Sequence, residues 1–216
     1  MLAAVFIRES NLIESVDIPL QAILIQLGYH DPKTSFGGHA GALLSANENA
    51  AENKPITERM ARDWQGLIIE EQNAICANTE NLISGRHVGH YRDCGVSVGN
   101  KICPPAKTVP SKMKRLIRAI NAFQARKNAK NPPGRNEIIE QLAAFHFWFL
   151  IIHPFVDGNG RTGRLLAWYL FIYFDLTPFV FTNYDKYKTY YRTFEKGTSN
   201  RMKIYFLNKM NSPKVA

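Results

Sequence analysis

The segment from Ile138 to Ile152 is fifteen residues long, and all but three of its residues are apolar. Strands in globular proteins usually hold about 5–6 residues, so an apolar run of this length favours a helix. Asn136 stands where an N-cap is expected. We therefore predict a helix over residues 136–152, followed by a loop at 153–159, with no strand directly before the glycines of that loop.

Most of the remaining sequence is also patterned for helices. After Pro110, Ser111 is the expected N-cap of a helix in which Met113, Leu116 and Ile120 recur at helical spacing. Residues 84–105 differ, because they are rich in glycine and contain short alternating runs, which is typical of a β-hairpin. Five or more helices with one hairpin and no strand–helix–strand alternation predict a mainly α fold. Further helices are expected at 5–28, 41–49, 57–76, 160–174 and, as the last one, 184–195.

Length and composition set the general class of protein. With 216 residues and 45% apolar residues, the chain can form one domain with a real core. The opening apolar run is broken by Arg8 and Glu9 and is too short for a signal peptide, and no later segment has the length of a membrane span. Three cysteines without metal-ligand spacing favour reduced thiols. We expect a cytoplasmic protein without membrane contact.

The formal net charge of +9 calls for an anionic partner, which could be nucleic acid, an acidic protein, lipid or nucleotide phosphates. The densest basic stretch, residues 112–130, is interpreted either as a solvated helix face or as a binding patch.

Residues 153–164 concentrate groups that bind phosphate. Gly158 and Gly160 let the backbone approach a ligand closely, and the helix that follows presents free N–H groups and a positive dipole end. Arg161 and Arg164 are three residues apart, so both project from one helix face toward phosphate oxygens. The segment therefore predicts an anion site at the start of a helix.

Two other residues of this segment add catalytic chemistry. Asp157 is placed to hold a Mg²⁺ ion that bridges phosphates. The ordinary pKa of His153 suits proton abstraction near neutral pH. Together with the anion site, these groups indicate phosphate-transfer chemistry.

The same glycines also match the dinucleotide fingerprint G-x-G-x-x-G, through Gly158, Gly160 and Gly163. That fingerprint requires a strand before it and a βαβ unit around it, whereas the preceding run suits a helix. The other alternative is a glycine-rich loop with solvated arginines, which leaves the clustering of all these groups unexplained.

The segment closely resembles the signature of the Fic family, His-x-Phe-x-(Asp/Glu)-Gly-Asn-Gly-Arg-x-x-Arg, and every fixed position matches at 153–164. The likeness extends over roughly 85–216, taken as a core domain, with a looser likeness in an N-terminal helical region at 1–84. It also rests on Tyr91-Arg92, Val98-Gly99, Pro104-Pro105, Val109-Pro110, Phe145-His146, Phe149 and Tyr190-Tyr191.

This resemblance implies a Fic-like helical bundle with a β-hairpin "flap", and a transfer of AMP from ATP to a Ser, Thr or Tyr hydroxyl of a target protein. By the likeness, His153 deprotonates the hydroxyl, Asp157 holds Mg²⁺, and Arg161 and Arg164 neutralise the departing pyrophosphate. Phe155 is expected to pack inward and set the loop. The implied nucleotide site further includes Gly158, Asn159, Gly160, Thr162 and Gly163, the flap residues Val98, Gly99, Asn100 and Lys101, and Tyr190 and Tyr191, which either lie beside the adenine or are packing aromatics.

The resemblance also implies partners. A target segment would add to the edge of the flap by main-chain hydrogen bonds, and the sequence leaves a homodimer open. The same site in a variant enzyme could transfer UMP, phosphate or phosphocholine. A basic nucleic-acid-binding protein is the alternative from another class, although no reading motif for nucleic acid is present.

A last resemblance concerns regulation. Ser10 and Glu14, on an expected helix at about 6–15, resemble the family's inhibitory motif (Ser/Thr)-x-x-x-Glu-(Gly/Asn), and their spacing places both on one helix face. The likeness implies that Glu14 pairs with Arg164 and occupies the place of the γ-phosphate. Ser15 departs from the motif, and Glu48 in the segment 45–49 is a rival candidate with shorter spacing.

Overall fold

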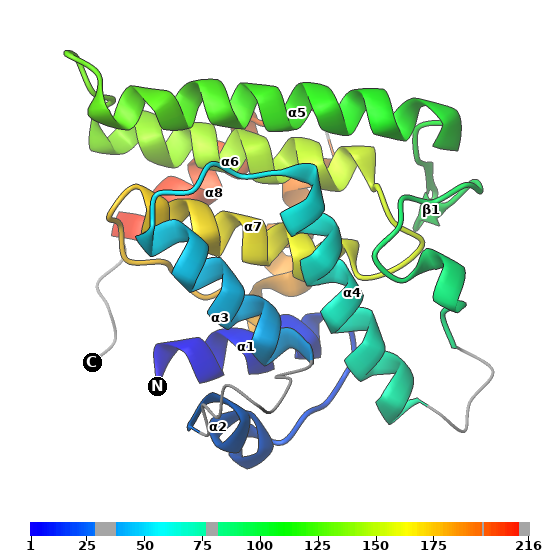
Figure 1. Cartoon of the computed structure of the whole chain (residues 1–216). Coiled ribbons are helices and arrows are strands. Elements are labelled where there is room, and N and C mark those ends of the chain that lie inside the picture. Colours follow the sequence, from blue (N-terminus) through cyan, green and yellow to red (C-terminus); the bar gives the residue numbers. More distant parts are fainter. Residues whose placement is uncertain (29–37, 77–81, 196, 212–216) are drawn as a thin grey trace.

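The apolar run before the loop is helix α6 (Arg135–Ile152), and it packs against α7 (Asn159–Tyr173), as Figure 1 shows. The predicted helix is confirmed. The computed structural model describes residues 1–216 except 29–37, 77–81, 196 and 212–216. Nearly every residue of α7 is buried, because helices cover it on several sides.

The other helices surround this pair. Helices α1, α3 and α4 pack on α7, while α5 and α8 pack on α6. A continuous core of buried apolar side chains joins the two groups, so the N-terminal helices and the remainder of the chain share one interior. Helix α2 packs on α1 and α3 instead. These helices are α1 (Leu2–Ile13), α2 (Leu20–Gly28), α3 (Gly38–Ala51), α4 (Glu58–Ile75), α5 (Val109–Gln124) and α8 (Asn200–Asn211).

A small hairpin stands at one side of the helices (Figure 1). Strands β1 (Ser97–Val98) and β2 (Lys101–Ile102) are antiparallel, and Ser97 pairs with Ile102. Gly99 has a left-handed φ of 54° in the connecting turn, a conformation that glycine adopts without steric cost. The mainly α fold with one hairpin is therefore confirmed. Short helical turns complete the chain: η1 (Gly85–His87), η2 (Ala106–Thr108), η3 (Ala125–Asn128), η4 (Asn183–Asp185), η5 (Lys186–Tyr190) and η6 (Tyr191–Phe194).

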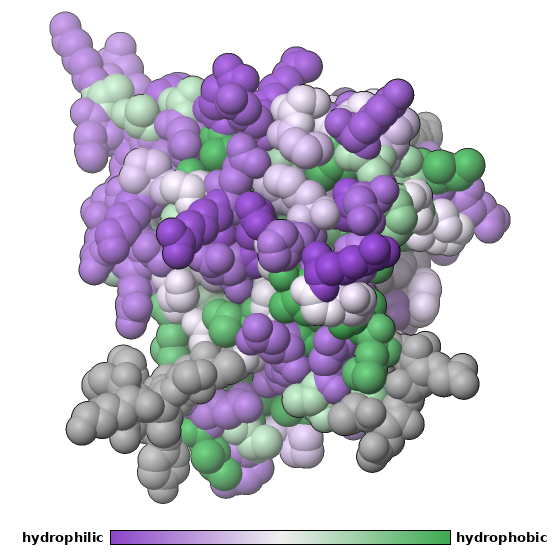
Figure 2. All heavy atoms as spheres, turned by 45° about the vertical axis from the view of Figure 1, so that its right-hand side comes forward, coloured by the Kyte–Doolittle hydropathy of each residue, from purple (hydrophilic) through white to green (hydrophobic). Residues whose placement is uncertain are grey.

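The surface of α5 is basic. Lys114, Arg115 and Arg118 are exposed on the side of the helix opposite its buried residues. Figure 2, which brings the flap side of the molecule forward, shows hydrophilic side chains along the top, where α5 lies. The amphipathic pattern that predicted this helix thus also accounts for the basic stretch.

The prediction of one helix over 5–28 is wrong. Helix α1 ends at Ile13, and Ser15 takes a left-handed φ of 61°. The N–H of Ser15 donates to the carbonyl of Leu12 and that of Val16 to the carbonyl of Asn11, which is a Schellman motif. Pro19 then disfavours helical backbone at the residue before it, so α2 begins only at Leu20.

Two predicted helix starts are also displaced. Helix α5 begins at Val109 with Thr108 as its N-cap, and the hydroxyl of Ser111 donates to the Thr108 carbonyl instead of capping. Pro110 sits in the first turn, where its fixed φ suits a helix and its missing N–H costs nothing. The N-cap of α6 is Gly134 rather than Asn136.

The predicted last helix at 184–195 is not a regular α-helix. The segment is a succession of η4, η5 and η6, which wraps the aromatic side of the core. The last helix is α8, in which Met202, Tyr205 and Phe206 are buried at helical spacing. The same spacing of Met202, Tyr205 and Phe206 is present in the sequence.

Among the residues that the structure describes, no helix combines the length and apolar character required to cross a bilayer. The cysteines Cys76, Cys94 and Cys103 form no disulfide.

Helices α6 and α7 approach closely because position 163 is glycine. A Cβ at Gly163 would lie 3.0 Å from Leu150 Cδ2 and 3.1 Å from Phe149 Cδ1. We expect Gly163→Val to lower the free energy of unfolding by about 1–3 kcal/mol, because the added methyl groups overpack this contact. Urea unfolding followed by circular dichroism measures the change. Gly85→Ala, at an open position, should stay within about 0.5 kcal/mol of the wild type; equal stability of the two variants would contradict the packing argument.

Candidate active site

The loop between α6 and α7 begins and ends with left-handed residues. His153, the C-cap of α6, has φ 50° and ψ 64°, and Gly158, the N-cap of α7, has φ 79°. A left-handed conformation is costly for a residue with a Cβ, so His153 must be held there by its surroundings. The two turns reverse the chain sharply and bring the histidine next to the start of α7.

Asn159 closes the loop from inside. Its side-chain oxygen accepts from the N–H of Phe155, and its amide donates to the Phe155 carbonyl, both at 2.9 Å. Phe155 is fully buried, as expected for a residue that sets the loop. The Asn159 side chain therefore holds the loop in place through both its oxygen and its amide nitrogen.

The imidazole of His153 is oriented by the helix that precedes it. Nδ1 donates to the carbonyl of Leu150 at 3.3 Å, which leaves Nε2 unprotonated in the neutral ring. Burial lowers the pKa of His153 below its ordinary value, although the Leu150 hydrogen bond opposes this, and the nearby Arg92 lowers the pKa further. At neutral pH the ring is therefore neutral, as a general base must be.

Arg92 is a site residue whose role the sequence did not reveal. It is 2% exposed, and its guanidinium donates to main-chain carbonyls on both sides, to His153 at 2.7 Å and to Cys94 at 2.8 Å. A third bond reaches the Pro104 carbonyl. The arginine thus fastens the base of the flap to the loop and supports the left-handed backbone of His153.

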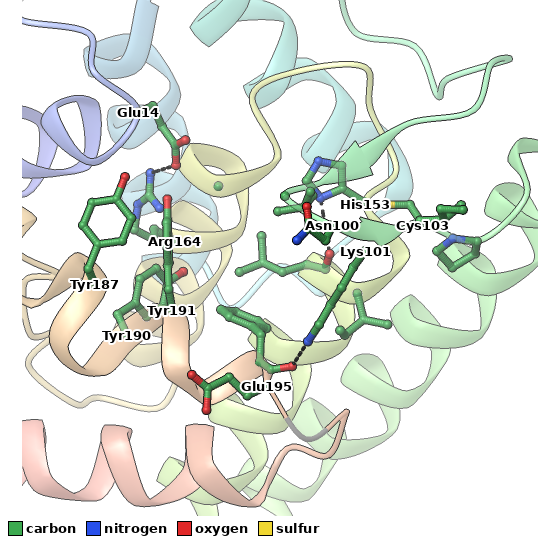
Figure 3. A pocket seen from close by; sticks show the side chains of 18 of the residues that line it. Glu14, Asn100, Lys101, Cys103, His153, Arg164, Tyr187, Tyr190, Tyr191 and Glu195 are labelled. Carbon is green, nitrogen blue, oxygen red and sulfur yellow. Dashed lines mark hydrogen bonds and ion pairs between the residues drawn. The ribbon is translucent and has the colours of Figure 1, made fainter.

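A cavity of about 920 Å³ lies between the flap, the loop that joins α6 to α7, and the aromatic residues of η5 and η6 (Figure 3). His153 and Arg164 lie on either side of it. Lys101, on β2, spans one side by donating to the carbonyl of Phe194 at 2.6 Å. The volume falls in the usual range for small-molecule sites. Of the residues predicted to bind nucleotide, the lining includes Val98, Gly99, Asn100, Lys101, Gly160, Arg164, Tyr190 and Tyr191.

Arg164 is fully buried and is held by α1. Its Nε donates to the Ser10 hydroxyl at 2.9 Å, and its Nη2 donates to the Glu14 carboxylate at 2.7 Å. Burial would lower the pKa of Arg164, but the Glu14 carboxylate outweighs it and the pKa is raised. The rival Glu48 is exposed on α3.

The same carboxylate touches the start of α7. A Cβ at Gly160 would overlap Glu14, so glycine is required for this approach. Main-chain N–H groups at the start of a helix are free to bind an anion. Glu14 therefore stands at the position where the sequence predicted a phosphate.

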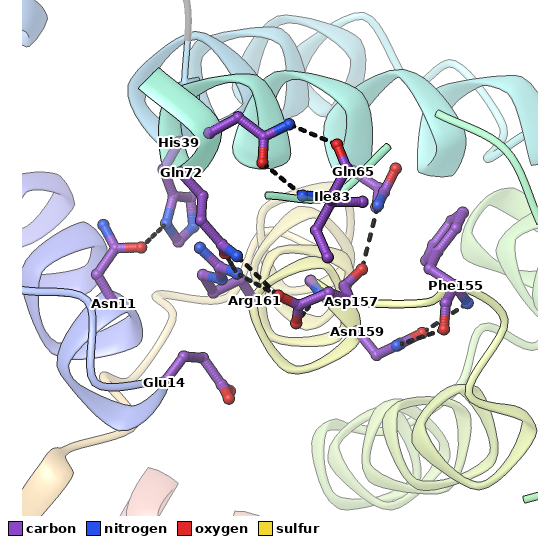
Figure 4. Close-up of polar contacts among 12 residues, drawn as sticks. Asn11, Glu14, His39, Gln65, Gln72, Ile83, Phe155, Asp157, Asn159 and Arg161 are labelled. Atoms are coloured by element: carbon purple, nitrogen blue, oxygen red, sulfur yellow. Dashed lines mark hydrogen bonds and ion pairs between the residues drawn. The ribbon is translucent and has the colours of Figure 1, made fainter. Parts of the chain in front are cut away.

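Asp157 and Arg161 lie on another side of α7, against α4 (Figure 4), and neither lines the cavity. The Asp157 Oδ2 is 3.9 Å from Arg161 Nη2. Arg161 is 2% exposed, and burial lowers its pKa in spite of the Asp157 charge. Glutamines of α4, which the sequence gave no reason to single out, contact both residues.

Thr162 and Gly163, also predicted to bind nucleotide, face the core. Thr162 is fully buried, and Gly163 packs against α6. Tyr190 is buried too, and its hydroxyl bonds His146 Nε2 at 2.8 Å while His146 Nδ1 donates to the Gly163 carbonyl. Tyr190 thus belongs to the packing of the cavity wall, and its neighbour Tyr191 is more open.

This loop, flap and cavity are matched by known proteins. The sequence profile of the Fic/DOC family fits residues 55–171, more than half of the chain. The chain belongs to the Fic/DOC family. The matched region begins at the N-terminal side of α4, well before residue 85.

Two curated relatives in this family are named as adenylyltransferases. A probable protein adenylyltransferase of Aquifex aeolicus is 32% identical over 120 residues, which is 55% of this chain and 35% of the relative. Protein adenylyltransferase Fic of Nematostella vectensis is 31% identical over 123 residues, 57% of this chain and 26% of the relative. The chain thus matches only about a third or less of these relatives' length.

Solved structures agree on the fold. A Fic domain containing signaling protein from Bacteroides thetaiotaomicron superposes with a TM-score of 0.72 at 19% identity, covering 97% of this chain and 83% of that protein. Fic-1 from C. elegans gives 0.67 at 16% identity, covering 96% of this chain and 59% of that one. The Fic fold therefore extends over the N-terminal helices as well.

Buried His146 makes the stability of this Fic domain depend on pH. Burial lowers the pKa of His146 to about 3, so the unfolded chain binds a proton between that pH and 6.5 that the folded chain does not. Stability must therefore fall on acidification in this window, by about 2 kcal/mol between pH 7 and pH 5 from this group. Urea unfolding at several pH values should show a shallower pH dependence for His146→Gln than for the wild type. The exposed His90 serves as a control, and His90→Gln should retain the wild-type slope; an unchanged slope in His146→Gln would contradict the assignment.

Proposed function

We propose that this protein is a protein adenylyltransferase, which transfers AMP from ATP to a Ser, Thr or Tyr hydroxyl of a target protein. The observation that carries the proposal is the shared cavity of His153, Arg164 and the start of α7. The family membership and the two relatives named as adenylyltransferases support it.

The chemical step follows from the orientation of His153. Nε2 accepts the proton of the target hydroxyl, and the hydroxyl oxygen attacks the α-phosphorus of ATP. A new P–O bond to the target forms as the bond to the β-phosphate oxygen breaks, and pyrophosphate leaves with the electron pair. Arg164, which lines the cavity, binds the β- and γ-phosphates, and Arg161, which is buried beside the cavity, adds a second positive charge. The N–H groups at the start of α7 bind phosphate oxygens.

Asp157 fits the demands of a Mg²⁺ ion. The described residues contain no cluster of three or more His, Cys, Asp or Glu side chains that could hold a metal by themselves. Magnesium at nucleotide sites is typically held by one or two carboxylates together with substrate phosphates, so a single carboxylate beside the anion site is sufficient. Bound Mg²⁺ would neutralise the phosphate charge, and Asp157 would orient it.

The flap has two tasks in this proposal. Val98, Gly99, Asn100 and Lys101 cover the nucleotide, and Tyr191 lies beside the adenine. A target segment adds to the exposed edge of the hairpin by main-chain hydrogen bonds, and the exposed side chains of Val98 and Ile102 are available to it.

Helix α1 acts as a brake on this reaction. Glu14 uses the donors of Arg164 and the space beside Gly160 that a γ-phosphate needs. The Glu14 carboxylate and the γ-phosphate are both anionic, so they compete for the Arg164 guanidinium. The enzyme becomes active when α1 withdraws the carboxylate.

Removing the Glu14 carboxylate should release the enzyme. We expect Glu14→Gly to raise modification of proteins in a lysate, or of the enzyme itself, on the order of 10-fold or more, since a hydrogen bond to a charged group contributes about 1.5–3 kcal/mol. Mass spectrometry after incubation with ATP and Mg²⁺ detects the added AMP. Adding His153→Ala to the same protein should abolish the transfer, because a positioned base contributes about 10²–10⁴-fold.

Glu48→Gly is the matched control, because Glu48 is the rival glutamate and lies exposed on α3. It should behave as the wild type. A rise in AMP transfer by Glu48→Gly, or no rise by Glu14→Gly, would contradict the inhibitory role of Glu14.

Ser15 makes the brake weaker than it could be. The Schellman turn at the end of α1 requires a left-handed residue, and a Cβ there costs about 1 kcal/mol, whereas glycine avoids that cost. We expect Ser15→Gly to hold Glu14 more firmly and to reduce basal AMP transfer by about 5-fold. Ser15→Val should have the opposite effect. The rates of modification with labelled ATP decide between these outcomes, and equal rates in both variants would refute the role of this turn.

Two alternatives have distinct signatures. Transfer of UMP, phosphate or phosphocholine would give a different added mass in the same experiment. Nucleic-acid binding through α5 would appear as salt-dependent binding of duplex DNA that survives Arg161→Ala.

A further inference from the structure

Helix α4 presents two glutamines to the loop before α7. Gln65 and Gln72 are seven residues apart, two turns of helix, so their side chains share one face. Gln65 is fully buried, and its amide donates to the main-chain carbonyl of Asp157 at 3.1 Å. Gln72 donates to the Asp157 side chain, at Oδ2, at 2.8 Å. Helix α4 thus forms hydrogen bonds with both the backbone and the carboxylate of Asp157 (Figure 4).

Gln72 also holds Arg161. Its Oε1 accepts a short hydrogen bond from Arg161 Nη2. One amide therefore uses its donor on the carboxylate and its acceptor on the guanidinium. In Figure 4 it sits between the two groups, which come from the loop and from α7.

The amide contacts two groups of opposite charge that have the chemistry to pair directly. Asp157 and Arg161 have the spacing of an i, i+4 ion pair, yet Oδ2 and Nη2 remain 3.9 Å apart, beyond hydrogen-bond length. A buried guanidinium gains much from a carboxylate contact, and Arg161 already has a buried Nε without a hydrogen-bond partner among the described residues. Gln72 hydrogen-bonds to both groups, while the carboxylate and the guanidinium form only a long ion pair without a direct hydrogen bond.

We propose that Gln72 is a positioning residue that keeps the Asp157 carboxylate available to a divalent cation by preventing its collapse onto Arg161. The inference rests on the proposed function, since it concerns the cation of the same site. Each carboxylate oxygen of Asp157 receives one hydrogen bond, Oδ1 from the N–H of Gly158 and Oδ2 from Gln72, so each retains a lone pair. A bidentate pair with Arg161 would use those lone pairs.

The neutral amide of glutamine suits this task better than other side chains of similar size. A glutamate at 72 would repel Asp157 and pair with Arg161, while a methionine of similar size would offer neither a donor nor an acceptor. Partners of metal ligands in the outer shell typically change metal affinity by about 10–100-fold when they are removed.

The test compares nucleotide binding with and without a metal. The parent protein carries Glu14→Gly, to free the site, and His153→Ala, to prevent turnover. Calorimetry gives its Kd for ATP with Mn²⁺ and with EDTA. The metal ratio is the affinity for ATP with Mn²⁺ divided by the affinity with EDTA. We expect Gln72→Met to reduce this ratio by about 10–100-fold. In active Glu14→Gly protein, the same change should raise the Mg²⁺ concentration needed for half-maximal AMP transfer.

Two controls separate positioning from a general loss of structure. Gln124 is a buried glutamine whose amide bridges the N–H of Ile56 and the hydroxyl of Tyr169, in a different part of the core. Gln124→Met should lower stability and leave the metal ratio unchanged. Adding Gln72→Met to Asp157→Asn should cause no further loss in the ratio, because the residue acts through Asp157.

The outcomes are distinct from those of the proposed function. An unchanged ratio in folded Gln72→Met, an equal fall in Gln124→Met, or a parent that binds ATP equally with and without Mn²⁺ would overturn the positioning role. If the ratio falls as expected but Glu14→Gly transfers no AMP, the positioning role stands and the proposed reaction fails.

Discussion

Burial of two arginines at the start of one helix governs the arrangement of this protein. Arg161 and Arg164 are 2% and 0% exposed, and a buried charge is very costly unless paired and hydrogen-bonded. The charges cannot be satisfied by α7 itself, whose first turn offers only N–H donors. Other helices must therefore supply acceptors: the α1 segment supplies Ser10 and Glu14 to Arg164, and α4 supplies Gln72 to Arg161.

This requirement explains why the N-terminal helices share the interior of the molecule. Ser10 and Glu14 bring α1 onto Arg164, and Gln72 brings α4 onto Arg161. His39 of α3 lies near both, and burial followed by the charges of the two arginines lowers its pKa well below the ordinary value. An anionic nucleotide could replace Glu14 as a partner of Arg164 but could not replace the packing of α4. The two arginines are thus held by different groups, Arg164 by a carboxylate and Arg161 by a neutral amide.

Local backbone geometry supports the same site. His153, Gly158 and Ser15 are left-handed, and each stands at a helix end that touches the cavity or the arginines. Only one of the three is glycine. The strain at His153 is balanced by Arg92, which donates to its carbonyl, whereas among the described residues Ser15 shows only the main-chain bonds of its turn. Positions that look ordinary in the sequence can thus carry the geometry of the site.

The sequence by itself determined the elements with strong local patterns: α6 through its long apolar run, α5 through its helical spacing, and the loop through its glycines and charged residues. Those signals depend on neighbours within a few residues, which the chain order contains. The break of the first helix is local as well, because it depends on the turn at Ser15 and on Pro19. The irregular turns of 183–194 and the partners Gln65, Gln72 and Arg92 were decided by tertiary structure. Contacts of this kind join residues far apart in the sequence: Gln72 and Asp157 are 85 residues apart, and Arg164 and Ser10 are 154 apart. A glutamine on a helix face looks the same in sequence whether it meets water or a carboxylate, and only the packing of α4 against α7 distinguishes the two.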